Sequence, residues 1–163
     1  MRADRIAIVA AWLLIVVAVA YTVSGHERTL RDGQLVLLQL APVDPRSLMQ
    51  GDYMALRFAV DGQLPREDGQ WPNYAHLHVG AEGRAVLAGA GDEPSSEPGM
   101  VSMRIRQNGR EASVGPNAFF FQEGTAAVYE EARWGGFRVA ADGTALLTAL
   151  YDENLQLLGS NRR

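Results

Sequence analysis

The sequence predicts a mainly β protein: a single antiparallel β domain, built as a sandwich or a small barrel with one short helix, behind an N-terminal transmembrane helix. Three observations predict this fold class. Residues 6–23 are eighteen consecutive residues without a charge, close to the roughly 20 residues that a helix needs to cross a hydrocarbon core. Further along, short segments alternate between apolar and polar residues, and three glycine-containing turn dipeptides separate such segments. The length of 163 residues suits one domain.

The apolar segment also predicts how the chain is placed. We expect residues 1–5 in the cytoplasm, residues 6–23 in the bilayer, and residues 28–159 as an extracytoplasmic β domain. Arg2 and Arg5 precede the apolar segment, and basic residues hold the flanking end of a span in the cytoplasm. The predicted location is therefore the cytoplasmic (inner) membrane, with a single pass and the N-terminus inside.

A cleaved signal peptide is the alternative to a retained anchor. The residues "AVA" at 18–20 have the small-x-small form of a signal-peptidase site. However, Tyr21, Thr22 and Val23 continue the apolar run beyond that site, which favours an anchor that stays in the membrane.

Charge and composition exclude several classes of function. Residues 24–163 contain 13 arginines and 18 acidic residues, a formal charge of −5. We therefore expect no nucleic-acid partner, because attraction to phosphate dominates such binding. The chain has no cysteine, so neither disulfides nor thiolate metal sites can form. It also has no lysine, since all fifteen basic residues are arginine.

The first predicted strands follow the anchor. Residues 34–40 form an apolar run that is too short for a helix and predicts a strand buried on both faces. Residues 52–60 then alternate, with Asp52, Met54, Leu56 and Phe58 on one face and Tyr53, Ala55, Arg57 and Ala59 on the other. Met54, Leu56 and Phe58 are expected in the core.

Three hairpins and one helix complete the predicted domain of about eight or nine strands. The hairpins turn at Glu82-Gly83, at Asn108-Gly109 and at Asp142-Gly143, and Asn-Gly favours a type I′ turn. In the middle hairpin Val101, Met103 and Ile105 should face inward. Residues 89–99 are expected to form an acidic loop. A helix is predicted over residues 126–134, with Thr125 as its N-cap and Gly135-Gly136 at its end.

Two segments resemble a bacterial family. They are "DPRSLMQGDYMALRF" and "FFFQEGTAAVYEEARWGGFRVAADGTALLTAL", and they are similar to the GDYXXLXY family, which is named for its signature. Gly51, Asp52, Tyr53 and Leu56 match that signature, whereas Phe58 stands where the family has tyrosine. The resemblance implies a small membrane-anchored bacterial protein without established activity. Some members accompany multispan membrane proteins, and the resemblance implies no catalytic residues.

The signature segment has a structural and a docking interpretation. The residues concerned are Arg46, Gly51, Asp52, Tyr53, Leu56, Arg57 and Phe58. In the structural interpretation, which we favour, Gly51 starts a strand abruptly after a turn, and Asp52 accepts turn N–H groups or pairs with Arg46. In the docking interpretation, Tyr53 and Arg57 stack on each other or on a partner, and Arg46 adds to the same surface.

Catalysis and metal binding are the weaker interpretations. Ser47 in "SLMQGD" is similar to the serine of signal-peptidase-type enzymes, but its spacing of four to the glycine is too short and the lysine base is absent. The available histidines are His26, His76 and His78. His76 and His78 leave the same face of a strand and could hold Zn or Cu with a third ligand, yet "RAVLAG" offers no acidic residue there. We expect exposed histidines and no metal or cofactor.

The predicted function is therefore non-enzymatic. We expect a single-span accessory or interaction subunit whose partners are the lipid bilayer, through residues 6–23, and a multispan membrane protein. The alternative is an envelope ligand-binding domain, which would need a pocket lined by Trp71, Trp134 or tyrosines. Glu130-Glu131 diverge around the predicted helix and should be solvated. In "FFF" at 119–121, two rings should lie on one side of the strand and one on the other.

Overall fold

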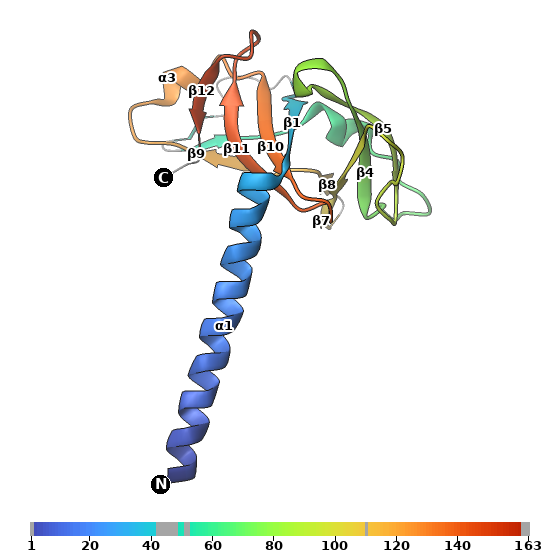
Figure 1. Ribbon diagram of the computed structural model, residues 1–163. Helices are drawn as coiled ribbons and strands as arrows, with labels where there is room; N and C mark the ends of the chain where they lie inside the picture. The colour runs from blue at the N-terminus through green and yellow to red at the C-terminus, as the bar shows by residue number, and fades with distance from the viewer. Residues whose placement is uncertain (1, 42–48, 51–52, 110, 161–163) are drawn as a thin grey trace.

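A single long helix projects from a domain of short strands (Figure 1). The computed structural model describes residues 2–41, 49–50, 53–109 and 111–160. Helix α1 (Arg2–Asp32) has 31 residues, and it is long and apolar enough to cross a membrane. Its described side chains from residue 8 to residue 28 are exposed. The helix does not stop at the end of the apolar run but continues through the polar residues 24–32, which we call the stalk.

The junction between α1 and the domain contains no linker. Strand β1 (Gln34–Gln39) begins after one intervening residue, Gly33. The backbone N–H of Gly33 donates to the carbonyl of Thr29 at 2.9 Å, and its carbonyl accepts from Arg138 Nη1 at 3.0 Å. Thr29 is buried. A Cβ on Gly33 would lie only 3.1 Å from the backbone nitrogen of Val139, so the end of α1 packs directly on the sheet.

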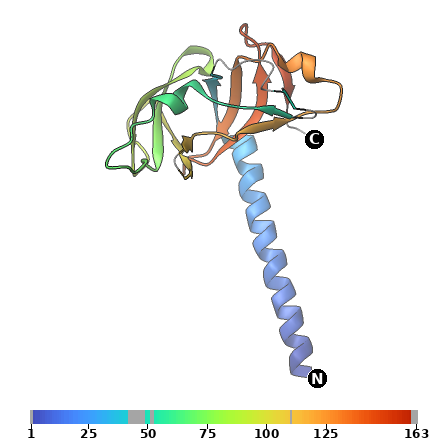
Figure 2. The ribbon, with the colours of Figure 1, turned by 180° about the vertical axis from the view of Figure 1, so that it is seen from behind.

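The described strands form four sheets, and Figure 2 shows the domain from behind. The largest has the antiparallel order β1-β10-β11-β12, with β10 (Trp134–Val139), β11 (Ala145–Tyr151) and β12 (Leu157–Ser160). A second has the order β5-β4-β6, with β4 (Tyr74–Val79), β5 (Ala85–Gly91) and β6 (Met100–Arg104). A third, β2-β3-β9, joins β2 (Met49–Gln50), β3 (Tyr53–Ala55) and β9 (Ala118–Phe120). The fourth pairs β7 (Arg106–Asn108) with β8 (Glu111–Ser113).

The fold class is the predicted one, although the strands are more numerous and shorter. The described residues form twelve strands, several of only two or three residues, where eight or nine were expected. Within this described part no sheet closes into a barrel. The described residues also form the 3₁₀ helices η1 (Ala59–Gln63) and η2 (Ala81–Gly83) and the short helix α3 (Ala126–Tyr129).

The apolar core joins the sheets, and the alternation patterns predicted much of it. The middle of β1 is buried, as expected for residues 34–40. Met54, Leu56 and Phe58 are buried, as are Val101, Met103 and Ile105. The predicted strand over residues 52–60 is shorter, because only residues 53–55 pair as β3 and η1 begins at Ala59.

All three hairpins exist, with one change of register. The turns at Glu82-Gly83 and Asp142-Gly143 are in place, with positive φ at Glu82, Gly83 and Gly143. In the middle hairpin Asn108 pairs with Glu111, so the loop begins at Gly109, one residue later than predicted. The strand expected there is also divided, since β6 pairs with β4 while β7 pairs with β8. Residues 89–91 belong to β5 and not to the acidic loop.

The predicted helix over residues 126–134 is wrong in its length and in its end. Helix α3 contains only residues 126–129, and the Thr125 side chain makes no capping hydrogen bond to it. Gly135 and Gly136 lie inside β10. Side chains there would collide, because a Cβ on Gly135 would lie 2.9 Å from Phe58 Cε1 and one on Gly136 would lie 2.6 Å from Tyr151 Cε2. These glycines therefore serve packing between strands.

Candidate functional site around the signature strand

The signature strand β3 lies in the middle of its sheet, between β2 and β9. Its outward face presents an aromatic pair, because Tyr53 is opposite Phe120 in the register. The two ring centroids are 5.9 Å apart with their planes tilted by 44°. Tyr53 is half-buried, whereas Phe120 is 70% exposed. This sheet therefore leaves a large aromatic ring in contact with solvent.

The three phenylalanines of β9 and its end divide as expected. Phe119 is buried, and Phe119 and Phe121 both contact the ring of Tyr129, at centroid distances of 5.4 and 5.0 Å. Phe120 points to the other side. The prediction of two rings on one side and one on the other is confirmed, and the single ring is the exposed one.

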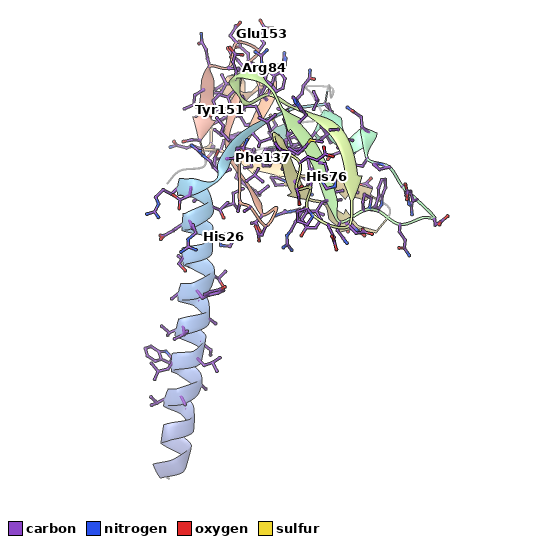
Figure 3. The ribbon with its side chains drawn as sticks, turned by 45° about the vertical axis from the view of Figure 1, so that its right-hand side comes forward. His26, His76, Arg84, Phe137, Tyr151 and Glu153 are labelled. Carbon is purple, nitrogen blue, oxygen red and sulfur yellow. The ribbon has the colours of Figure 1, made fainter. Side chains whose placement is uncertain are left out.

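The inward face of the signature segment is part of the core. Phe58 is 2% exposed and packs edge-on against Phe137, with 5.2 Å between ring centroids. The label in Figure 3 shows Phe137 inside the domain. Two glycines, Gly115 and Gly135, lie against the Phe58 ring. The last position of the signature is thus a core position in this chain, and the ring there is not accessible to a ligand.

Asp61 holds the end of the signature segment in place, and the sequence analysis missed it. Its carboxylate accepts hydrogen bonds from the backbone N–H of Phe58 at 3.2 Å, the hydroxyl of Ser113 at 2.9 Å and the backbone N–H of Val114 at 2.9 Å. Burial raises the pKa of the Asp61 carboxyl, and the three hydrogen bonds act against that shift. Asp61 therefore connects η1 to the segment after β8.

Arg57 is exposed on the outward side of the same segment. Its backbone carbonyl accepts from the N–H of Ala41 at 2.8 Å. Tyr53 contacts the ring of Phe120, and its stacking on Arg57 or on a partner stays a prediction. The described part of the chain shows no ion pair of Arg57. Arg46, Ser47, Gly51 and Asp52 lie outside the described residues, so the corner and hydrolase hypotheses for them stay predictions.

Only one of the two strand histidines is exposed, although both were expected to be. His76, labelled in Figure 3, is half-buried with its Nδ1 3.0 Å from Ser102 Oγ. Ser102 Oγ in turn accepts the backbone N–H of Ser95 at 2.8 Å. His78 is exposed. Among the described residues no group of three or more possible metal ligands occurs, and His76 instead helps to fix the loop before β6.

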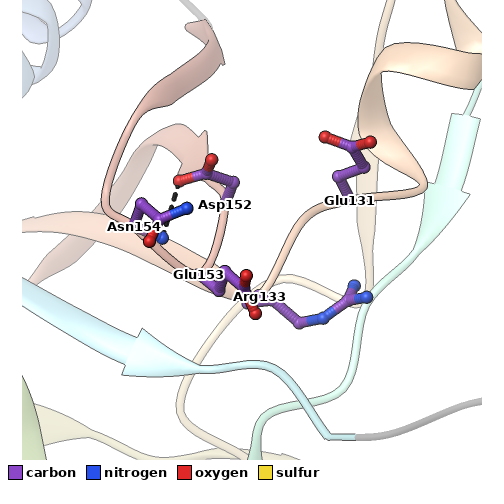
Figure 4. Close-up of a pocket in the computed structure, with 5 residues that line it drawn as sticks. All are labelled: Glu131, Arg133, Asp152, Glu153 and Asn154. Atoms are coloured by element: carbon purple, nitrogen blue, oxygen red, sulfur yellow. Dashed lines mark hydrogen bonds between the residues drawn. The ribbon is translucent and has the colours of Figure 1, made fainter.

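One pocket among the described residues differs from the pocket expected for a ligand-binding domain. A pocket of about 280 Å³ is lined by Glu131, Arg133, Asp152, Glu153 and Asn154 (Figure 4). Asp152 Oδ1 accepts the backbone N–H groups of Asn154 and Gln156, which is an ordinary role in a turn. Glu130 and Glu131 are exposed, as predicted. This lining is polar and contains no aromatic residue.

The two tryptophans expected in such a pocket each lie against an arginine. Arg66 Cζ is 5.3 Å from the Trp71 ring centroid, and Arg84 Cζ is 5.2 Å from that of Trp134. Neither tryptophan is among the residues that line the pocket of Figure 4.

Comparison with known proteins gives one match. The family model described as "GDYXXLXY protein" matches residues 15–150. No curated protein and no solved structure matches the chain.

Proposed function

We propose that this chain, which belongs to the GDYXXLXY protein family, is a non-enzymatic, single-span accessory subunit of a multispan membrane protein. Helix α1 carries the proposal. Its apolar side chains are exposed, and no part of its most apolar window is buried in the domain. An apolar helix of this length needs lipid or another helix around it. We place the N-terminus in the cytoplasm, because Arg2 and Arg5 precede the span.

The partner contact in this proposal uses α1 together with the outward face of β3 and β9. Phe120 supplies exposed apolar area, Tyr53 lies against it, and the exposed Arg57 follows β3 two residues after its end. Aromatic and arginine side chains are enriched in the residues that contribute most to protein–protein affinity. This face defines the docking surface of the proposal: Tyr53, Arg57 and Phe120.

A topology measurement tests the membrane part. Spheroplasts that express the chain with a C-terminal tag are treated with protease, before and after lysis. We expect the tag to be removed from intact spheroplasts, and the protein to stay in membranes washed at high pH with its first residues uncleaved. A tag protected until lysis, or a chain found in the soluble fraction, contradicts the proposed anchor and orientation.

A co-purification measurement tests the partner part. The tagged chain is purified from detergent-solubilised membranes, and we expect a multispan protein in near-stoichiometric amount. Phe120→Ala and Arg57→Ala should reduce its yield without changing the melting temperature of the β domain. Val86→Ala and Arg66→Ala are matched controls, since they remove an exposed apolar and an exposed basic side chain elsewhere. Elution of the native chain alone, or equal loss in all four variants, contradicts the docking surface.

A further inference from the structure

The strand register determines which end of the domain faces the same side as α1. β1 leads away from α1, and β10 returns beside it, so that Val139 is opposite Gln34. The turn at residues 140–144 therefore lies at the α1 end. Arg104 Nε donates to the carbonyl of Asp142 in this turn at 3.0 Å, and Tyr74 pairs with Arg104. The start of β4 and the end of β6 are thus at the α1 end as well.

The β7–β8 hairpin continues from that end. It follows β6 after one residue, Ile105, whose N–H donates to the carbonyl of Asn73 at 2.8 Å. Gln107 Nε2 donates to the carbonyl of Trp71 at 3.2 Å. In Figure 1 the hairpin is the lowest part of the domain and reaches below the last turn of α1. Figure 2, turned about the vertical axis, shows the same height.

The length of the stalk places this hairpin close to the membrane surface. Nine helical residues, 24–32, rise by about 13 Å at 1.5 Å per residue. The interfacial layer on each side of a bilayer is about 5–8 Å thick, from the difference between its total and hydrocarbon thickness. The hydrogen bonds of Gly33 and the burial of Thr29 join the stalk directly to the sheet. The hairpin that descends beside the stalk in Figures 1 and 2 is therefore held on the membrane side of the domain.

We propose that the β7–β8 hairpin contacts the phospholipid headgroups of the membrane that α1 crosses, and that Arg106 binds their phosphates. The inference rests on the membrane anchor of the proposed function. Arg106 is exposed at the first position of β7. Guanidinium groups bind phosphate oxygens in a bidentate manner.

The charge at the opposite end of the domain agrees with this orientation. Arg84 and Glu153, labelled in Figure 3, lie at the end away from α1. The pocket there is lined by three acidic residues, Glu131, Asp152 and Glu153, and by one basic residue, Arg133. An anionic lipid surface repels these acidic groups and attracts the guanidinium of Arg106.

The absence of cysteine allows a clean test on the full chain. Asn108→Cys, Ala81→Cys and Leu13→Cys each carry one environment-sensitive fluorophore, in nanodiscs that contain lipids with nitroxide quenchers on the headgroup or in the acyl chain. We expect headgroup quenching at position 108 and none at position 81, the exposed turn at the other end of β4. Acyl-chain quenching at position 13 shows whether α1 lies in the bilayer, whatever the result at position 108.

The outcomes separate the two proposals. If position 13 is not quenched from the acyl chain, the anchor fails and the headgroup contact fails with it. If position 13 is quenched but position 108 behaves like position 81, only the headgroup contact is overturned.

The role of Arg106 is tested by lipid composition. Replacing half of the phosphatidylcholine with phosphatidylglycerol should increase headgroup quenching at position 108. Arg106→Gln should abolish that increase, whereas Arg133→Gln, an exposed arginine beside the distal pocket, should preserve it. Phosphate binding by Arg106 is overturned if phosphatidylglycerol does not change the quenching when Arg106 is present. It is also overturned if phosphatidylglycerol still increases the quenching in the Arg106→Gln variant.

Discussion

Phe58 is buried because two glycines far along the chain make room for its ring. A Cβ on Gly115 would collide with Phe58 and would lie 2.9 Å from Phe137 Cζ. We predict that Gly115→Ala lowers the free energy of unfolding by about 1–3 kcal/mol, the usual cost of overpacking a core. Denaturant unfolding of the full chain in detergent, followed by the fluorescence of Trp71 and Trp134, measures this loss.

A double variant and a matched control complete this experiment. Phe58→Leu replaces the ring that the new methyl group would meet with a smaller side chain. Gly115→Ala should therefore reduce the free energy of unfolding less in the Phe58→Leu background. Gly89→Ala, in a strand position with nothing within 4 Å of the added Cβ, should leave stability nearly unchanged. Equal losses for Gly115→Ala and Gly89→Ala would show that the Phe58 contact is unimportant.

Asp61 gives a pH-dependent prediction at the same scale. Burial raises the pKa of its carboxyl in the folded state, so the folded protein binds this proton more tightly than the unfolded one. Its contribution to stability is complete below the unfolded pKa, about 4, and is lost as pH rises through the folded value. We predict that the difference in unfolding free energy between the native chain and Asp61→Asn shrinks as pH rises from 4.

Asp142 is the control for this pH profile, because its shift has the opposite sign. A hydrogen bond from the Thr144 N–H is the largest cause that lowers the pKa of the Asp142 carboxyl. The difference in unfolding free energy between the native chain and Asp142→Asn should therefore grow with pH over the acid range.

At neutral pH Asp61→Asn should still lower the free energy of unfolding by about 1–3 kcal/mol, since an amide nitrogen leaves one buried N–H without an acceptor. A flat or rising Asp61 difference would contradict the assignment.

At the residue scale, the sequence predicted which side chains are buried. It did not predict which distant residues hydrogen-bond to one another. Alternation alone placed Met54, Leu56 and Phe58 in the core, because the period of a strand is local. The partners of Asp61, which are Ser113 and Val114, depend on how distant segments meet. No local pattern distinguished Asp61-Gly62 from an ordinary turn dipeptide.

At the scale of elements, the joint between α1 and β1 makes the clearest prediction. A Cβ on Gly33 would collide with the backbone carbonyl of Thr29 and approach both the nitrogen and the oxygen of Val139. Gly33→Ala should therefore destabilise the joint by about 1–3 kcal/mol, as for other overpacked sites. It should also broaden the distance distribution between spin labels on α1 and on β11, measured by pulsed electron paramagnetic resonance.

Gly25 is the matched glycine in the same helix. Nothing lies within 4 Å of a Cβ built on it. At an exposed helix position alanine is more favourable than glycine by up to about 1 kcal/mol. Gly25→Ala should keep the label distances narrow and should not destabilise the chain. Broadening in both variants would mean that the joint is not held by the packing of Gly33.

The errors in the element predictions share a physical cause. Gly135-Gly136 after a helix-forming run is a typical helix end by local rules, yet β1 and β11 flank this segment and make it a central strand. Likewise the polar residues 24–32 suggested that the helix was over, whereas its end packs on β10 and β11. Tertiary contacts decided both cases.

At the scale of the whole molecule, the stalk sets both the height and the rotation of the domain relative to the membrane. One alanine inserted after Gly25 rotates the domain by about 100° and lifts it by only about 1.5 Å, whereas seven lift it by about 10 Å and nearly restore its rotation. Lipid surrounds the helix on all sides, but a partner bound to α1 lies on one side. The two proposed contacts should therefore respond differently to these insertions.

We predict that the single insertion preserves headgroup quenching at position 108 and reduces co-purification of the multispan partner, because it turns Phe120 and Arg57 away from that partner. The seven-residue insertion should abolish the quenching, since it lifts the hairpin beyond the interfacial layer of about 5–8 Å. Quenching in nanodiscs and co-purification from membranes measure the two effects separately. Loss of quenching after the single insertion would contradict the headgroup contact, because lipid surrounds the helix on all sides and a rotation of the domain should not remove that contact.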